Sequence, residues 1–207
     1  MGNIFGFSTN FKFGPTKSLI QELDDERNVD LVILTKGAIG QLADKNVVQF
    51  PFVDLASTGI GLAKRPGLKS PDISTVEGFK NFLTTSTSIA YTSDGVSGIY
   101  IANLIEEFHM TEALRAKTKK VQGGYAAELI IQGDCDYALQ NISELMGVKG
   151  IEIVGPFPDQ IQLVTIFSGA VTRSSNHTKM GIDFLKTLES AKAQSIFKSR
   201  GLEVINK

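Results

Sequence analysis

Apolar residues recur along the chain in two kinds of short run, and these predict alternating strands and helices. Residues 31–35 form an unbroken, mostly β-branched run, which is typical of a strand covered on both faces. A short apolar strand at residues 88–91 leads into a small-residue loop, and helical spacing follows at Ile101, Leu104, Ile105 and Phe108. This alternation continues toward the C-terminus and favours an α/β fold with mainly parallel sheets.

Local patterns also predict where several elements begin and end. Residues 10–14 alternate and predict a short strand, and the segment at residues 15–18 opens a helix. Ser74 with Glu77 has the spacing of a capping box, so a helix is expected to begin at Ser74. Gly123 and Gly124 are expected to begin another. Residues 179–200 predict a single helix, which Gly201 ends.

Two glycine-bearing strands suggest how the chain divides into lobes. They lie at residues 55–63 and 163–172, on either side of the series of strands and helices between residues 74 and 158. The arrangement predicts an inserted second lobe at residues 74–160, entered and left by two crossings. Residues 1–73 together with 161–207 would then form a discontinuous first lobe.

Four polar strand ends each lead into a predicted helix start, at residues 14–18, 94–98, 122–124 and 140–143. A helix start has backbone N–H groups without intrahelical partners, and the macrodipole favours negative charge there. In open α/β sheets the ligand crevice lies beyond the carboxyl ends of the strands, so all four loops are expected to meet at one cleft. One hydrogen bond contributes only about 1 kcal/mol, so several must converge on one anion. Taken alone, each loop is equally an ordinary capped turn.

Composition narrows the classes of function. Hydrophobic residues make up 42% of the 207 residues and charged residues 21%, with a net charge of -1, which indicates a globular protein and gives no support for a nucleic-acid partner. Cys135 is the only cysteine, so no internal disulfide forms, and Asp134 and Asp136 beside it disfavour a nucleophilic thiolate. The only histidines, His109 and His177, have no motif neighbours. The sequence therefore predicts no catalytic residue, no metal site and no cofactor.

The ends of the chain bear on localisation. Residues 1–7 lack a basic segment followed by a long apolar core, so no signal peptide is predicted, and no apolar run reaches membrane-spanning length. Two explanations stay open: a cytoplasmic product, or a natural N-terminus that lies upstream of Met1.

A family resemblance emerges from these segments. LVILTKGAIGQLADK, DLASTGIGLAKRPG, PDISTVEGFK, SIAYTSDGVSGIY, KVQGGYAAELI, QNISEL, TIFSGAV, IDFLKTLES and FKSRGLE resemble, in order and spacing, the molybdate-binding-like branch of periplasmic solute-binding proteins. The resemblance runs over residues 13–203. It implies a type II periplasmic-binding fold of two α/β lobes that close on a ligand. It also implies a periplasmic location and delivery of the ligand to the membrane subunits of an ABC transporter.

The resemblance further implies which residues contact the ligand. The positions that match the family's site are Thr16, Val96, Ser97 and Asn141, with Gln140 and Gly124 as further contacts. Two departures accompany them. The family's first strand-helix unit precedes the part that matches residue 10, where this chain has only residues 1–9, and Phe167 stands where the family has a cleft tyrosine.

Three functions compete on this basis. The leading hypothesis is a non-catalytic protein that captures a small oxyanion or organic acid for an ABC transporter. The second is an isomerase acting on a small tricarboxylate, similar to aconitate isomerase, with Asp94, Tyr125 or His109 as the base. The third is a truncated, binding-impaired homologue, whose open sheet edge favours self-association. The ligand, the transporter and the oligomeric state stay open.

Overall fold

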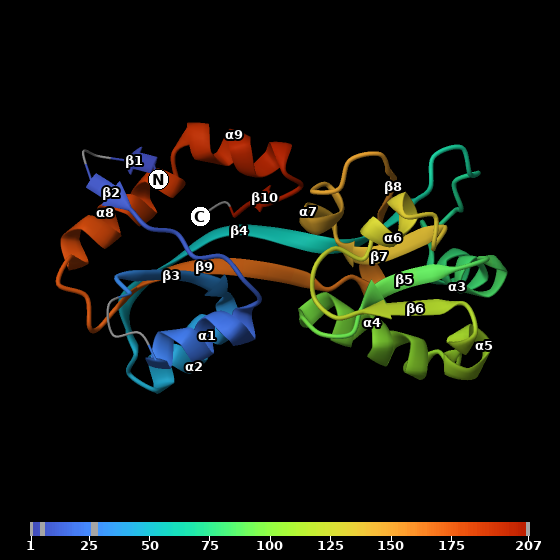
Figure 1. Ribbon diagram of the computed structural model, residues 1–207, viewed down its shortest axis with the longest axis horizontal. Coiled ribbons are helices and arrows are strands. Elements are labelled where there is room, and N and C mark those ends of the chain that lie inside the picture. The colour runs from blue at the N-terminus through green and yellow to red at the C-terminus, as the bar shows by residue number, and fades with distance from the viewer. Residues whose placement is uncertain (1, 5–6, 26–28, 206–207) are drawn as a thin grey trace.

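The computed structural model describes residues 2–4, 7–25 and 29–205 and shows two lobes joined by long strands (Figure 1). A small antiparallel pair, β1 (Gly2–Ile4) and β2 (Phe7–Thr9), stands apart from the main sheet. Residues 10–14, where a strand was expected, are irregular instead, so that prediction is wrong. Their alternation has no strand beside it to pair with in this part of the chain.

The main sheet has eight strands and spans both lobes. Its order is β3-β9-β4-β7-β5-β6, and β8 and β10 also pair with β4. The strands are β3 (Leu31–Thr35), β4 (Val48–Lys64), β5 (Ile89–Thr92), β6 (Thr118–Val121), β7 (Tyr137–Asn141), β8 (Glu152–Pro156), β9 (Val164–Thr172) and β10 (Glu203–Val204).

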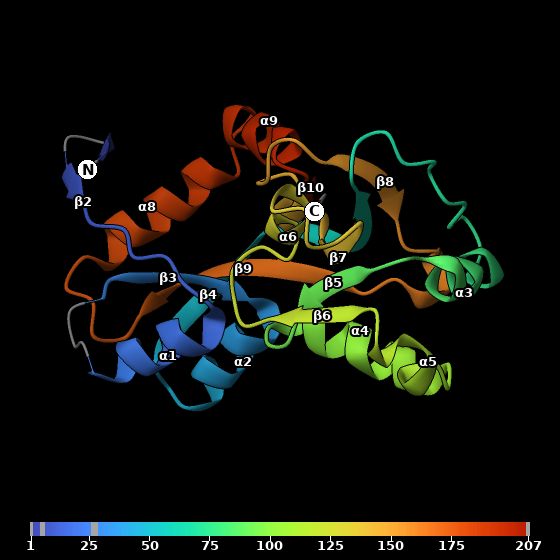
Figure 2. The same cartoon turned by 45° about the vertical axis from the view of Figure 1, so that its right-hand side comes forward.

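Helices flank this sheet in both lobes (Figures 1 and 2). The first lobe carries α1 (Thr16–Asp25), α2 (Lys36–Asp44), α8 (Thr178–Leu188) and α9 (Ala191–Ser199). The second carries α3 (Val76–Thr85), α4 (Val96–Glu107), α5 (Thr111–Arg115), α6 (Glu128–Ile131) and α7 (Ile142–Leu145), and the short 3-10 helix η1 (Asp159–Ile161) precedes the return crossing. The α/β class and the two-lobe arrangement are confirmed.

Strand directions follow from the two crossings. The chain leaves the first lobe along β4 and returns along β9 beside it, so these strands are antiparallel, as are the pairs of β4 with β7, β8 and β10. Parallel pairs join β5 to β6 and to β7. The sheet is therefore mixed, whereas the alternation of elements favoured mainly parallel pairing.

Each lobe has its own hydrophobic core. In the first lobe, Leu34, Ile39 and Leu42 pack in one buried cluster, and Leu55, Val171 and Leu185 form another. In the second lobe, the largest cluster runs from Ile60 and Leu62 through Phe79, Phe82 and Leu139 to Phe157. Strand β4 thus changes from one core to the other between Leu55 and Ile60.

The Gln162 side chain hydrogen-bonds to the backbone of β4 at Ile60, where the strand passes from one core to the other. The Ile60 N–H donates to Gln162 Oε1 at 2.7 Å, and Gln162 Nε2 donates back to the Ile60 carbonyl at 3.0 Å. A Cβ at Gly59 would lie 2.9 Å from Gln162 Nε2, so the close approach needs glycine there. The carboxamide takes the place of a strand neighbour beyond Gly59↔Val164, the last pair of β4 with β9.

Three helix boundaries differ from the sequence predictions. The cap of α3 is Thr75, whose hydroxyl accepts from the Gly78 N–H, because Ser74 forms a turn with Asp72 instead. Ser190 caps α9 and divides the predicted C-terminal helix into two. The helix expected at Gly123 begins only at Glu128.

The first predicted strand also differs in its surroundings. Of its residues only Leu34 is buried, and Ile33 is 39% exposed. Because β9 is the one strand partner of β3 among the described residues, β3 lies at the edge of the sheet. Val32 packs against one hydrophobic cluster and Leu31 against the other, so the expected cover on both faces is present only in part.

Candidate ligand-binding site

Three strands of the second lobe end side by side. Because β5 is parallel to both β6 and β7, the loops after all three leave the same edge of the sheet. Two hydrogen bonds tie the loops together: the Gly123 N–H donates to Asp94 Oδ1 at 2.7 Å, and the Ser93 N–H donates to the Val121 carbonyl at 2.8 Å. The edge therefore presents one continuous group of loops.

Helix α4 begins at this edge. Gly95 has a left-handed φ of 82°, and Val96 after it is exposed. Ser97 is only 3% exposed, and its hydroxyl has no hydrogen-bond partner in the described part of the chain. A Cβ at Gly98 would lie 2.0 Å from the Thr92 carbonyl oxygen, so glycine lets the helix start pack directly on the end of β5.

Consecutive glycines shape the neighbouring loop. Gly123 and Gly124 have φ values of 69° and 70°, a left-handed conformation that glycine adopts without steric cost. Gln140 holds the loop from β7, accepting from the Ala126 N–H at 2.8 Å and donating to the Gly124 carbonyl at 3.0 Å. Gln140 is 1% exposed. Its carboxamide supports the loop.

The end of β7 completes the edge. Asn141 is buried, and its Oδ1 atom has no hydrogen-bond partner among the residues that the structure describes; the same is true of Glu144 Oε2 in the first turn of α7. Burial raises the pKa of Glu144 and outweighs hydrogen bonds from the Asn141 backbone and from the Gln140 and Asn141 side chains, which lower it. Sequence reasoning missed Glu144, although a carboxylate three residues after a polar strand end is the available signal.

The remaining predicted residue lies in the other lobe. Thr16 is the first residue of α1 and is half-buried. In both views α1 and α2 begin on the side of the first lobe that faces the second, and α4 begins on the side that faces the first (Figures 1 and 2). No hydrogen bond or ion pair joins Thr16 to the second-lobe residues within the described ranges.

A charged network stands where α2 begins. Lys36 Nζ lies 2.7 Å from Asp54 Oδ2, and Ser168 donates to Asp54 Oδ1 at 2.5 Å. Burial opposes ionisation of Asp54, but the hydrogen bonds from Lys36 and Ser168 and the Lys36 charge outweigh it and lower the pKa. Phe167, at the position where the family has a tyrosine, pairs in register with Thr35 on β3 and brings no hydroxyl.

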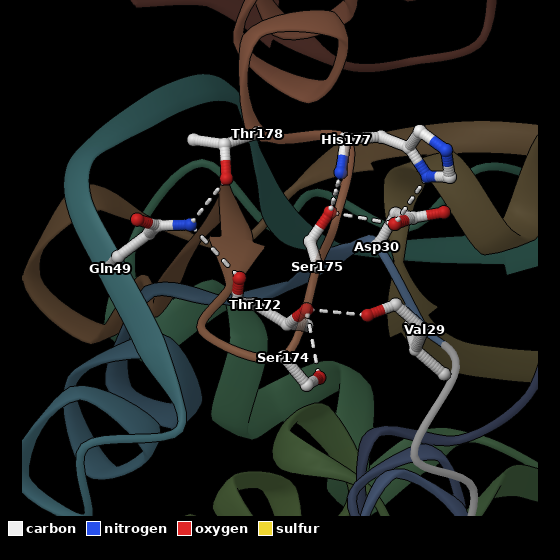
Figure 3. Close-up of polar contacts among 8 residues, drawn as sticks. All are labelled: Val29, Asp30, Gln49, Thr172, Ser174, Ser175, His177 and Thr178. Carbon is white, nitrogen blue, oxygen red and sulfur yellow. Dashed lines mark hydrogen bonds and ion pairs between the residues drawn. The ribbon is translucent and has the colours of Figure 1, made fainter.

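A serine, a histidine and an aspartate meet at the far end of the first lobe (Figure 3). Ser175 Oγ donates to Asp30 Oδ1 at 2.6 Å, His177 Nδ1 lies 3.1 Å from the same oxygen, and the His177 backbone N–H donates to Ser175 Oγ at 2.9 Å. A catalytic serine needs its hydroxyl hydrogen-bonded to the histidine imidazole, which takes up the proton. Here the hydroxyl bonds to the carboxylate, so the cluster closes a turn and is no triad.

Other chemistry can be placed or set aside. Burial is the main cause that raises the pKa of the Cys135 thiol, and Cys135 is buried. No group of three His, Cys, Asp or Glu residues in the described ranges could hold a metal ion. None of the described helices is long and apolar enough to cross a membrane. A hollow of about 460 Å³ lies beside the start of α7, lined by Gly59, Ile142, Lys198 and residues 201–204.

Comparison with known proteins identifies the class. The profile of the family described as bacterial extracellular solute-binding protein matches residues 6–203, and the chain belongs to this family. An aconitate isomerase from a Pseudomonas species is 32% identical over 178 residues, covering 85% of this chain and 68% of that protein.

Two solved structures share the fold. A periplasmic molybdate-binding protein from Azotobacter vinelandii has a TM-score of 0.72 at 14% identity, covering 93% of this chain and 86% of its own. PEB3 of Campylobacter jejuni, bound to L-phospholactate, has a TM-score of 0.69 at 17% identity, covering 97% and 90%. At these identities the likeness extends to the fold alone.

Proposed function

We propose that this protein captures a small oxyanion or organic acid between its lobes and delivers it to the membrane subunits of an ABC transporter from the periplasm. The observation that supports the proposal is the shared edge formed by the ends of β5, β6 and β7: the loops that contain Ser97, Gly124 and Asn141 leave the sheet there, and Asn141 Oδ1 is buried without a partner in the described ranges. Family membership supports ligand capture as the general activity.

Each site residue has a proposed role. Ser97 donates its hydroxyl, Val96 and Gly124 contribute backbone N–H groups, and Asn141 contributes its side chain. Thr16 approaches from the first lobe when the lobes close. Gln140 positions the loop and does not contact the ligand directly, because its carboxamide is already hydrogen-bonded to residues 124–126.

The lobe boundaries also stay a proposal. Residues 1–73 with 161–207 form the proposed first lobe and residues 74–160 the second. The hydrophobic clusters favour a first crossing nearer Gly59 and Ile60, because Ile60 already belongs to the core of the second lobe.

The named relatives support an anion as the ligand. Molybdate, L-phospholactate and aconitate are the compounds in the names of the three compared proteins. All three are anions with several oxygen atoms, which suits a site built from N–H and O–H donors. The proposed ligand class therefore includes both inorganic oxyanions and carboxylates.

Unfolding in the presence of ligand tests this function. Molybdate, tungstate, sulfate, citrate and trans-aconitate are added singly, and the free energy of unfolding is measured by chemical denaturation. A bound anion at 100 times its Kd adds about 2.7 kcal/mol. Ser97→Ala is expected to lower the affinity for that anion about tenfold, because it removes one charge-assisted hydrogen bond. Ser199→Ala, on the exposed face of α9, is the matched control. No stabilisation by any anion of the panel would refute the proposal.

Isomerisation of a tricarboxylate is a second candidate function, favoured by the 32% identity to aconitate isomerase. His109 is a poor base for it, because it follows α4 at the end away from the site, about 18 Å from the helix start. Asp94 is held by the Gly123 N–H, which leaves Tyr125 and Glu144 as the acid–base candidates.

Incubation with cis-aconitate in deuterated water tests the isomerase. Transfer of a proton gives the trans isomer with deuterium incorporated, followed by NMR. Glu144→Gln is expected to abolish turnover if Glu144 is the base, and Tyr125→Phe if the phenol is. An unchanged substrate with the wild-type protein would exclude this function while leaving anion capture intact.

We also propose self-association through the edge strand β3. Its free edge and the exposed Ile33 offer backbone and apolar contacts to a second copy. Analytical ultracentrifugation is expected to show a dimer that Ile33→Lys dissociates. A monomer at all accessible concentrations would contradict it.

A further inference from the structure

Two buried acceptor atoms at the start of α7 have no hydrogen-bond partner among the described residues. They are Asn141 Oδ1 and Glu144 Oε2, three residues apart across the first turn of α7. The Glu144 carboxyl accepts hydrogen bonds from the Asn141 backbone and from the Gln140 and Asn141 side chains, but Oε2 and Asn141 Oδ1 are left without a donor when Glu144 is ionised, which is unfavourable for buried acceptors. A proton on Glu144 changes the balance, since the neutral acid carries the missing donor.

The elements packed against α7 bring no compensating cation. The charged residues of β4 and β7, against which α7 packs, are Asp54, which pairs with Lys36, and Lys64, which pairs with Glu152 at the opposite end of β7 from Asn141. The titratable groups nearby are Tyr125, whose ring lies 3.4 Å from a Cβ built on Gly147, and Lys198 and Glu203, which line the hollow beside Ile142. None of these three contributes to the shift of the Glu144 pKa, which burial raises.

The proposed anion site includes Asn141, which also belongs to this pair. An anion at Ser97, Gly124 and Asn141 would therefore sit beside the Glu144 carboxyl. Two negative charges in a poorly solvated place repel each other, so the bound anion disfavours ionisation of Glu144, and ionised Glu144 disfavours binding of the anion. An ionised Glu144 opposes the anion, and a neutral Glu144 does not.

We propose that Glu144 takes up a proton when the site binds its anion, so that the protein captures an anion and a proton together. This inference rests on the proposed function and adds a coupling to it. The sign follows from linkage: the bound anion raises the pKa of Glu144 further, so affinity falls as pH rises between the pKa of the free and of the loaded protein. In that interval the fall is about tenfold per pH unit.

Isothermal titration calorimetry tests the coupling directly. The probes are molybdate and trans-aconitate, titrated in buffers of different ionisation enthalpy between about pH 6 and about pH 8, and the protonation of each anion alone is measured and subtracted. The wild type is expected to take up as much as one proton per bound anion. Glu144→Gln keeps the shape and a donor, so it should bind equally or more tightly, with no proton uptake and no dependence on pH. Glu128→Gln, an exposed carboxyl on α6, should behave as the wild type.

Carbon-13 NMR of the Glu144 carboxyl in the wild type, free and with each probe, gives a second measurement that depends on no variant. A higher titration midpoint in the loaded protein supports the coupling. Binding without proton uptake, or uptake that persists in Glu144→Gln, would overturn it while leaving anion capture in place. If neither probe binds at any pH, the proposed anion site fails and the coupling fails with it.

Discussion

At the scale of single residues, Gly98 controls how closely α4 approaches β5. A Cβ there would lie 2.0 Å from the Thr92 carbonyl oxygen and 2.5 Å from Thr92 Oγ1. Gly98→Ala must therefore move the helix start away from the strand, and we expect it to lower the free energy of unfolding by about 1–3 kcal/mol. Gly40→Ala is the matched control, because a Cβ at Gly40 on α2 meets nothing within 4 Å.

Chemical denaturation of both glycine variants checks this prediction. Gly40→Ala should stabilise the protein by about 0.5–1 kcal/mol, since alanine is the better helix residue. An equal effect of the two substitutions would show that backbone propensity, and not the contact with Thr92, decides the result. Gly98→Ala should also lower the affinity for any anion that binds at the start of α4.

Gln140 is expected to matter through the loop it holds. Gln140→Met keeps the volume but leaves the Ala126 N–H and the Gly124 carbonyl without their partner, at a cost of about 1–3 kcal/mol for each group that stays buried. Hydrogen exchange should speed up at the amides of residues 123–126. Gln122→Met, on an exposed residue of the same loop, is the control. Unchanged exchange in Gln140→Met would mean that the glycines alone fix the loop.

The sequence identifies these site residues only in part. Small and polar residues at strand ends predict the loops at residues 94–98, 122–124 and 140–143, and the structure places these loops at one edge. The choice of Ser97, Gly124 and Asn141 within them rests on the family resemblance. The supporting role of Gln140 could not be predicted, because its partners lie 14 and 16 residues earlier in the chain. The burial of Glu144 likewise depends on how α7 packs on β4, which no local pattern contains.

At the scale of elements, Asp54 links three of them. It lies on β4, accepts from Ser168 on β9 and pairs with Lys36 at the start of α2. Because the folded pKa of Asp54 is lowered, its contribution is fully present above the unfolded value of about 3.9 and is lost as pH falls through the folded pKa. We expect Asp54→Asn to remove about 0.5–1 kcal/mol at neutral pH, since Lys36 is largely exposed.

Urea denaturation as a function of pH checks the Asp54 prediction. The difference between Asp54→Asn and the wild type should shrink as pH falls below about 4. Asp44→Asn, at the exposed end of α2, controls for the loss of one negative charge. A difference that is constant down to low pH would assign the effect to packing.

Periodicity predicts the elements that long-range pairing leaves unchanged. The helices α4 and α8 and the strands β5 and β9 begin within one or two residues of the expected positions. The predicted helix boundaries are wrong where a contact with another residue determines where the helix begins. Thr75 caps α3 in place of Ser74, because the Ser74 hydroxyl donates to Asp72. Ser190 caps α9 and so divides a predicted helix whose apolar spacing continues across the break.

At the scale of the whole molecule, the two cores and the two crossing strands favour a hinge at Gly59, Ile60 and Gln162. Each lobe buries its own hydrophobic cluster, so the lobes can move as units while β4 and β9 bend between them. Opposed helix starts of α1, α2 and α4 give an anion more contacts when the lobes approach (Figure 2). Binding should therefore favour a closed arrangement over an open one.

Fluorescence energy transfer between the lobes tests closure. Lys186→Cys on α8 and Arg115→Cys on α5 place labels at opposite ends of the molecule, on exposed side chains (Figure 1). The native Cys135 should stay unlabelled, because it is buried and burial raises its pKa. We expect transfer to increase with the anion that stabilises the protein. Labels at Lys45→Cys and Lys186→Cys, both in the first lobe, should show no change. Stabilisation without a change in transfer would mean that the anion binds to one lobe, and that the edge formed by β5, β6 and β7 suffices without Thr16.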